Sequence, residues 1–152
     1  MRLARGLLPA AMPGDAMQDI VVSVVIPTRG RPALLQRCLD ALCRQTLPFE
    51  HYEIVVVDDG PSGATQAAVL GCATRMRPHG LALSYIASHG PHGPAAARNR
   101  GWRRARAALI AFTDDDTEPD PRWLEAGLAA FAPDSDAATG RVIMPLPESP
   151  NA

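Results

Sequence analysis

Two acidic clusters, each placed directly after an apolar run, are the residues best suited to chemistry. Asp58 and Asp59 follow the run EIVVV, and three consecutive carboxylates, Asp114, Asp115 and Asp116, follow IAFT. Adjacent carboxylates repel one another unless a cation neutralises them. Hard oxygen ligands suit Mg²⁺ or Mn²⁺, and Mg²⁺ usually takes one or two carboxylates while phosphate and water oxygens complete its shell. The pattern indicates a metal-bridged phosphate ligand; the alternative is a solvated acidic turn that caps the next helix.

The elements that must position these carboxylates alternate between strand and helix patterns. Runs rich in β-branched residues, apolar on both faces, predict buried parallel strands. The predicted strands are Ile20–Pro27, Tyr52–Asp59, Leu81–Ala87, Ala107–Thr113 and, from a weaker pattern, Ala137–Met144.

The segments between the strands have helical spacing and helix start signals. The predicted helices are Pro32–Cys43, a second capped by Ser62 and running through Ala73, a third from Pro94 through Ala108, and a fourth capped by Asp120 and ending near Phe131. Such alternation requires right-handed crossovers. The sequence therefore predicts an α/β fold, with a mostly parallel sheet covered by helices on both faces.

In an open α/β sheet, ligands bind beyond the carboxyl ends of the strands. The first strand is followed there by Thr28, Arg29, Gly30 and Arg31. We therefore expect two arginines and both acidic clusters to meet at one edge of the sheet.

Composition limits the possible functions. The chain has 152 residues, 15 basic and 16 acidic, with a net charge of −1, so it lacks the positive field of a nucleic-acid-binding domain. No apolar run approaches the length of a membrane span. Three cysteines without a CxxC pair are expected to be reduced and buried. These features indicate a cytoplasmic protein, or one at the inner face of the membrane.

From Val22 to about Val142 the chain resembles the N-terminal, nucleotide-sugar-binding half of family 2 glycosyltransferases with the GT-A fold. The resemblance rests on SVVIPTRGRP, EIVVVDDGPSG, GPAAARNRGWRRA and IAFTDDD followed by PDPRWLE, all in the family's order. It implies a hexosyltransferase-type enzyme. Such an enzyme moves a sugar from a nucleoside diphosphate to an acceptor hydroxyl with inversion.

The resemblance also implies roles for single residues. The loop against the base and ribose corresponds to Pro27, Thr28 and Arg29. Asp58 or Asp59 corresponds to the carboxylate that accepts a hydrogen bond from the base, commonly uracil, with guanine and thymine as alternatives. Arg98 corresponds to an arginine of the donor pocket, although a salt bridge to an aspartate explains it equally well.

The three carboxylates correspond to the family's DxD motif. Asp116 is expected to ligate Mn²⁺ or Mg²⁺ together with Asp114, while Asp115 approaches the nucleotide sugar. His89 and His92 lie in a Gly- and Pro-rich loop that either shapes this pocket or merely connects two elements.

The catalytic base is expected beyond Ala152, because family members carry it in the acceptor-binding half, and neither Asp134 nor Asp136 is assigned to that role. The expected organisation is a disordered tail over residues 1–19, a donor-binding half-domain over residues 20–143, and an irregular end over residues 144–152. The acceptor, whether glycan, lipid or protein, is not indicated. The alternative is a noncatalytic nucleotide-binding fragment or assembly remnant.

Overall fold

Four of the predicted strands form one parallel sheet in the computed structural model, which describes residues 20–131 and 134–144. The strands are β1 (Val22–Thr28), β2 (Tyr52–Asp58), β3 (Ala82–Ala87) and β4 (Leu109–Phe112), in the spatial order β3-β2-β1-β4. Thr28 pairs with Asp58 in register, so the ends of β1 and β2 lie level. Every residue of β1 and β2 is buried, which explains why apolar residues occupy both faces of these strands.

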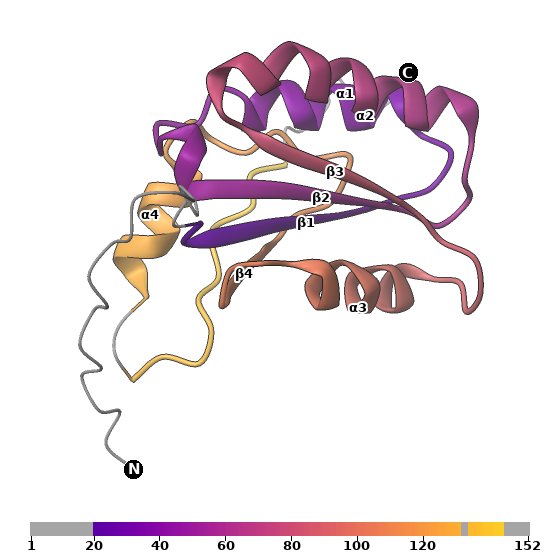
Figure 1. Ribbon diagram of the computed structural model, residues 1–152. Coiled ribbons are helices and arrows are strands. Elements are labelled where there is room, and N and C mark those ends of the chain that lie inside the picture. Colours follow the sequence, from indigo (N-terminus) through magenta and orange to yellow (C-terminus); the bar gives the residue numbers. More distant parts are fainter. Residues whose placement is uncertain (1–19, 132–133, 145–152) are drawn as a thin grey trace, which may run out of the picture.

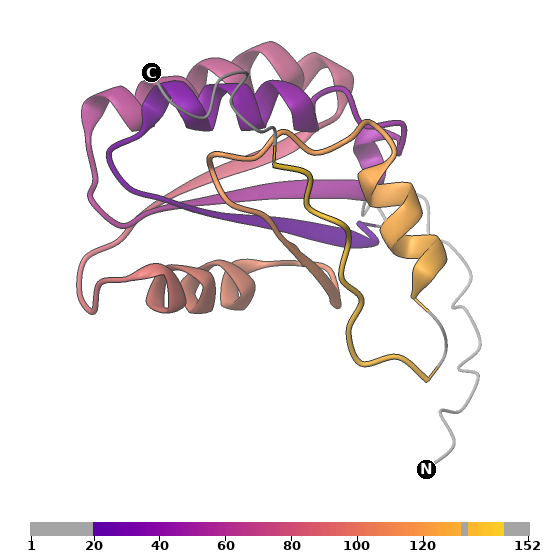
Figure 2. The same cartoon turned by 180° about the vertical axis from the view of Figure 1, so that it is seen from behind.

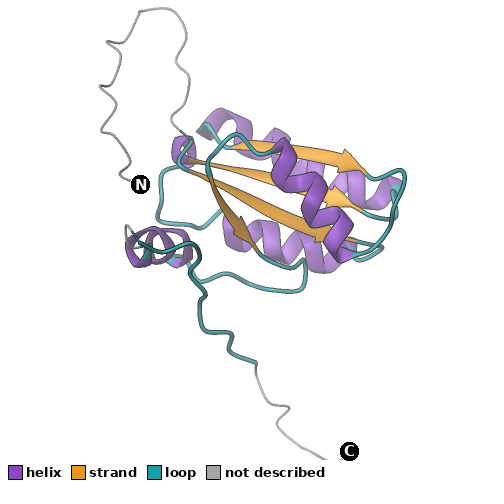
Figure 3. Ribbon diagram, turned by 90° about the horizontal axis from the view of Figure 1, so that it is seen from below, coloured by secondary structure: helices purple, strands orange, loops and turns teal. Residues whose placement is uncertain are grey.

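Helices cover both faces of the sheet, as predicted (Figures 1 and 3). Helices α1 (Pro32–Leu42) and α2 (Gly63–Met76) lie side by side on one face, and α3 (Pro94–Arg104) lies on the other. Two short 3₁₀ turns, η1 (Phe49–His51) and η2 (Arg77–His79), precede β2 and β3. The last helix, α4 (Trp123–Ala130), sits near η1, where β2 begins.

The two faces of the sheet differ in how closely a helix approaches. The larger core cluster includes Leu35 and Leu39 of α1 and Val69 of α2. The smaller cluster packs Ala97 of α3 onto the opposite face. A Cβ added to Gly101 of α3 would lie 2.3 Å from Cγ1 of Val25, so α3 reaches the sheet only because glycine stands there.

The predicted fifth strand, Ala137–Met144, is wrong. This segment is irregular, and Val142 is 80% exposed (Figure 2). Its β-branched residues have no neighbouring strand to pack against, and β-propensity depends on such packing.

Three helix boundaries also differ from the prediction by more than one residue. Helix α3 ends at Arg104 rather than Ala108, because the N–H groups of Arg106 and Ala107 donate to side chains of Glu53 and Ser23. Helix α4 begins at Trp123 with Arg122 as N-cap, whereas Asp120 was expected there. The second helix starts as predicted, with the Ser62 hydroxyl accepting from the Thr65 N–H at 3.1 Å, but continues to Met76.

The predicted N-terminal tail, residues 1–19, and most of the predicted C-terminal end, from residue 145, lie outside the described residues. Within the described part of the chain, no helix has both the length and the apolar character needed to cross a bilayer.

Candidate functional site

The carboxyl ends of the strands form a cleft of about 330 Å³ that collects most of the predicted site residues. Its lining consists of Pro27, Thr28, Arg29, Arg31, Asp59, Gly93, Pro94, Ala97, Arg98, Asp114 and Asp116. A larger hollow of about 430 Å³ lies at the opposite end of the strands, beside Glu53 and Arg106. We assign the site to the smaller cleft, because both acidic clusters contribute to it.

Asp115 faces into the protein and does not line the cleft. Its side chain is fully buried, and the Thr28 hydroxyl donates to its Oδ2 at 2.6 Å. Its Oδ1 lies 2.6 Å from the Arg31 guanidinium but without hydrogen-bonding geometry, so an ion pair alone balances that oxygen. Asp115 therefore anchors the acidic loop, residues Asp114 to Asp116, to the end of β1.

Asp114 and Asp116 flank this anchor and do line the cleft. Their side chains are about half exposed, at 51% and 48%. Arg98 lies 2.5 Å from Asp114, and Arg31 lies 3.2 Å from Asp116. The structure shows the salt bridge of Arg98 to an aspartate and places Arg98 in the lining of the cleft; its role toward a ligand stays a prediction.

This donor set fits a divalent metal that takes few protein ligands. Two hard carboxylates at the cleft suit Mg²⁺ or Mn²⁺. Among residues 20–131 and 134–144, no group of three or more His, Cys, Asp or Glu side chains is arranged so that it could hold a metal ion. Phosphate or water oxygens would therefore have to complete the coordination shell.

The two carboxylates at the end of β2 have different roles. Asp58 is buried and accepts from the N–H groups of Gly60 (3.1 Å) and Ser62 (3.3 Å) and from the Tyr85 hydroxyl (3.0 Å). These bonds hold the turn that leads into α2. Asp59 lines the cleft instead, so only one member of the pair contributes to it.

Asp59 is held by the loop between β3 and α3. It accepts from the Gly93 N–H at 2.7 Å and the Ser88 hydroxyl at 3.3 Å, and the His92 ring nitrogen Nδ1 lies 3.1 Å away. The Gly93 N–H bond, supported by His92 and Ser88, lowers the pKa of Asp59 despite the opposing effect of burial. Asp59 is thereby kept as an anion. Arg29, which is largely exposed, lies 3.8 Å from it.

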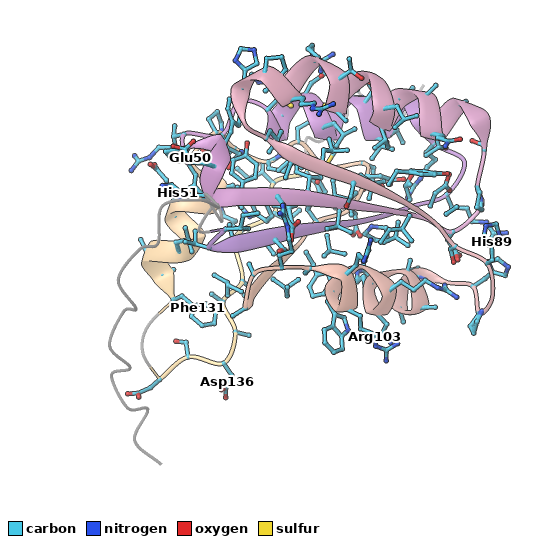
Figure 4. The ribbon with its side chains drawn as sticks, viewed as in Figure 1. Glu50, His51, His89, Arg103, Phe131 and Asp136 are labelled. Atoms are coloured by element: carbon cyan, nitrogen blue, oxygen red, sulfur yellow. The ribbon has the colours of Figure 1, made fainter. Side chains whose placement is uncertain are left out.

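Arg100 also supports this loop, a role that the sequence analysis did not predict. Its guanidinium donates to the Ser88 hydroxyl at 2.5 Å and to the Pro91 carbonyl at 3.0 Å. These bonds attach the loop between β3 and α3 to helix α3. The sequence feature that marks this loop is its glycine content. Gly93 has a φ of 113°, a conformation that other residues rarely adopt. Of the two loop histidines, His92 contacts Asp59, whereas His89 is exposed at the outer end of the molecule (Figure 4).

The carboxylates of the C-terminal segment lie elsewhere. Asp136 is exposed and lies at the far end of the molecule from His89 and the cleft (Figure 4). Asp136 is not among the residues that line the cleft.

Comparisons with known proteins agree with this architecture. The family model for glycosyl transferase family 2 matches residues 23–150. Among curated proteins, the chain is 39% identical over 122 residues to a validoxylamine A glucosyltransferase of Streptomyces hygroscopicus, covering 80% of this chain and 28% of that protein. It is 33% identical over 111 residues to the glycosyltransferase AglE of Haloferax volcanii, covering 73% and 35%.

Solved structures show the same fold. The mannosyltransferase PcManGT of Pyrobaculum calidifontis, in complex with GDP-Man and Mn²⁺, superposes with a TM-score of 0.61 at 30% identity over 71% of this chain and 30% of that one. S. aureus TarS 1–349 in complex with UDP has a TM-score of 0.60 at 26% identity, covering 72% and 31%.

The chain spans about a third or less of the length of these relatives. The match nevertheless covers most of the chain itself and includes the acidic loop, the arginines and the cleft. The fold is of the GT-A type, and the chain belongs to glycosyl transferase family 2.

Proposed function

We propose that residues 20–143 form the donor-binding part of an inverting, metal-assisted glycosyltransferase, which transfers a sugar from a nucleoside diphosphate to an acceptor hydroxyl. The observation that carries this proposal is the shared cleft: Asp59 follows β2, Asp114 and Asp116 follow β4, these two strands flank β1, and all three carboxylates line the cleft. A nucleoside diphosphate has both a hydrogen-bonding base and a charged diphosphate, and so matches such a divided site. The solved relatives bound to GDP-Man and to UDP support the same ligand class.

Asp59 is the proposed partner of the base. An anionic carboxylate forms a charge-assisted hydrogen bond with an imide N–H, which uracil carries. Asp58 is fully buried and does not line the cleft, whereas Asp59 does, which favours Asp59 for this contact. The strand end at Pro27, Thr28 and Arg29 would form the neighbouring wall for base and ribose.

Asp116 and Asp114 are the proposed ligands of Mn²⁺ or Mg²⁺. When bound, the metal supplies positive charge that assists departure of the nucleoside diphosphate. The two arginines that now pair with these carboxylates, Arg31 and Arg98, are suited to bind diphosphate oxygens, because a guanidinium recognises phosphate through paired N–H groups.

Inversion requires a general base that takes the proton of the acceptor hydroxyl. We assign no residue between 20 and 144 to this step, since the carboxylates of the cleft are already proposed to bind the nucleotide base and the metal. The acceptor-binding residues and the general base are proposed to lie in the part of the relatives that this chain does not match.

Calorimetry with uridine diphosphate, with and without Mn²⁺, tests this function. We expect metal-dependent binding that Asp116→Asn weakens at least tenfold and that Asp136→Asn, a matched change on an exposed carboxylate far from the cleft, leaves intact. Binding that is equally tight without metal and in Asp116→Asn would favour a noncatalytic nucleotide-binding fragment. No binding by a folded sample would overturn the assignment of the cleft.

A further inference from the structure

Two of the three cysteines face each other across neighbouring helices. Cys43 directly follows the last residue of α1, and Cys72 lies in α2, 29 residues later. Their sulfur atoms are 3.6 Å apart and share a hydrogen bond. The two helices lie side by side on one face of the sheet, so the pair sits on the side of the molecule opposite α3 (Figure 1).

The surroundings of the two sulfurs differ. Cys72 is buried, whereas Cys43 is partly exposed and can meet a small reagent. Arg75 lies 3.8 Å from the Cys72 sulfur and is itself held by Asp40 at 2.7 Å. The hydrogen bond from Cys72, with help from the Arg75 charge, lowers the pKa of Cys43, and the same bond raises that of Cys72. Cys43 is therefore the better nucleophile, because the thiolate is the attacking form.

We propose that Cys43 and Cys72 form a redox-active dithiol, which a small-molecule disulfide such as oxidised glutathione converts into an intramolecular disulfide between α1 and α2. The Cys43 thiolate attacks one sulfur of the reagent, a mixed disulfide forms, and the first glutathione leaves as a thiol. Cys72 then loses its proton and attacks the Cys43 sulfur, which breaks the mixed disulfide and releases the second glutathione. Two protein thiols are oxidised, and one reagent disulfide is reduced to two thiols that take up the two protons.

The required movement is small. A disulfide has sulfur atoms about 2.05 Å apart, so the present pair must approach by about 1.5 Å. Helices α1 and α2 are already in contact, and Cys43 is the C-cap of α1, where side-chain rotation and slight fraying can supply this shift.

The third cysteine provides an internal control. Cys38 is fully buried in α1, its sulfur contacts the Asp114 carbonyl oxygen at 3.5 Å, and burial raises its pKa to about 12. It lacks both access to solvent and a partner thiol. It is therefore expected to stay reduced.

The test uses the complete chain treated with oxidised glutathione and followed by intact mass and peptide mapping. The wild type and Cys38→Ser are expected to lose about 2 Da each, with a Cys43–Cys72 cross-link in the map. Cys72→Ser is expected to stop at a glutathione adduct on Cys43, and Cys43→Ser to remain largely unmodified. The oxidised wild type should also melt ~5 °C or more above the reduced form, because the bond closes a loop of 29 residues.

Three results would overturn the proposal. These are a wild type that keeps all of its thiols, a cross-link that involves Cys38, and a disulfide that joins two chains on a non-reducing gel. The Cys38→Ser variant checks the cross-link that involves Cys38, because this variant cannot form it and keeps the other two cysteines unchanged.

Discussion

The hydroxyl of Thr28, the last residue of β1, donates a 2.6 Å hydrogen bond to the buried carboxylate of Asp115, 87 residues later in the chain. This bond joins the end of a central strand to the middle of the acidic loop. Because Asp115 is held inward, its neighbours Asp114 and Asp116 are turned toward the cleft. One buried carboxylate thus sets the orientation of the two that can meet a ligand.

Replacing Thr28 with Val should cost about 1–3 kcal/mol of unfolding free energy, because a buried carboxylate loses its hydrogen-bond donor while the side-chain shape is kept. Thr28→Ser retains the hydroxyl and is expected to lose less. Urea denaturation of the three proteins measures the difference. A Thr28→Val protein as stable as the wild type, beside a destabilised Thr28→Ser, would show that the methyl group, not the hydrogen bond, matters at this position.

Arg31→Gln should tighten binding of Mn²⁺ alone several-fold, because the guanidinium that now pairs with Asp116 competes with the metal for that carboxylate. The effect is modest since Arg31 is half exposed and solvent screens the pair. Calorimetry with MnCl₂ measures it. Arg44→Gln, which removes the same charge from an exposed position beyond α1, is the control, and an equal gain there would point to net charge alone.

Glu53 should make the unfolding free energy depend on pH in the acidic range. Burial by itself would raise its pKa, but hydrogen bonds from Ser23 and Arg106 outweigh that effect, and the pKa is lowered from its ordinary 4.5. A carboxyl with a depressed pKa in the folded state stabilises the protein above pH 4.5, and this contribution is lost as the pH falls from there through the folded-state pKa.

Glu53→Gln should therefore lower the unfolding free energy at pH 7 by about 1–3 kcal/mol and reduce its decline below pH 4.5. Urea titrations at several pH values test both effects. Glu50→Gln, at an exposed position in η1, should change neither (Figure 4). An unchanged acid slope in Glu53→Gln would assign the pH dependence to other carboxylates.

Gly101→Ala should destabilise the protein by about 1–3 kcal/mol, because the new methyl group would meet Val25 and Val57 at the contact between α3 and the sheet. Gly71→Ala in α2 has nothing within 4 Å of the added carbon and should be neutral or stabilising by up to ~1 kcal/mol, since alanine favours the helix. Thermal unfolding distinguishes the two. Similar shifts would mean that α3 can move outward at no cost.

The sequence by itself determined the fold class and the general position of the site. The β-branched, mostly apolar runs of β1 and β2 predicted buried parallel strands, and each run ended in polar residues at the same edge of the sheet. The prolines and the serine that open α1, α2 and α3 act locally, through restricted backbone angles and a hydrogen bond three residues away, and so could be read from the chain alone.

Only the tertiary structure decided which member of each acidic cluster faces the cleft. Asp58 and Asp59 look equivalent in sequence, yet Tyr85 engages the first and the Gly93 amide the second. Partners distant in sequence also ended α3 at Arg104, placed Cys43 beside Cys72, and left Ala137–Met144 without a strand to pair with. In each case the deciding contact joins residues that are distant in sequence. A hydrogen bond or a packed side chain stabilises a conformation only when its partner is in place, and the packing of the elements decides which partner that is.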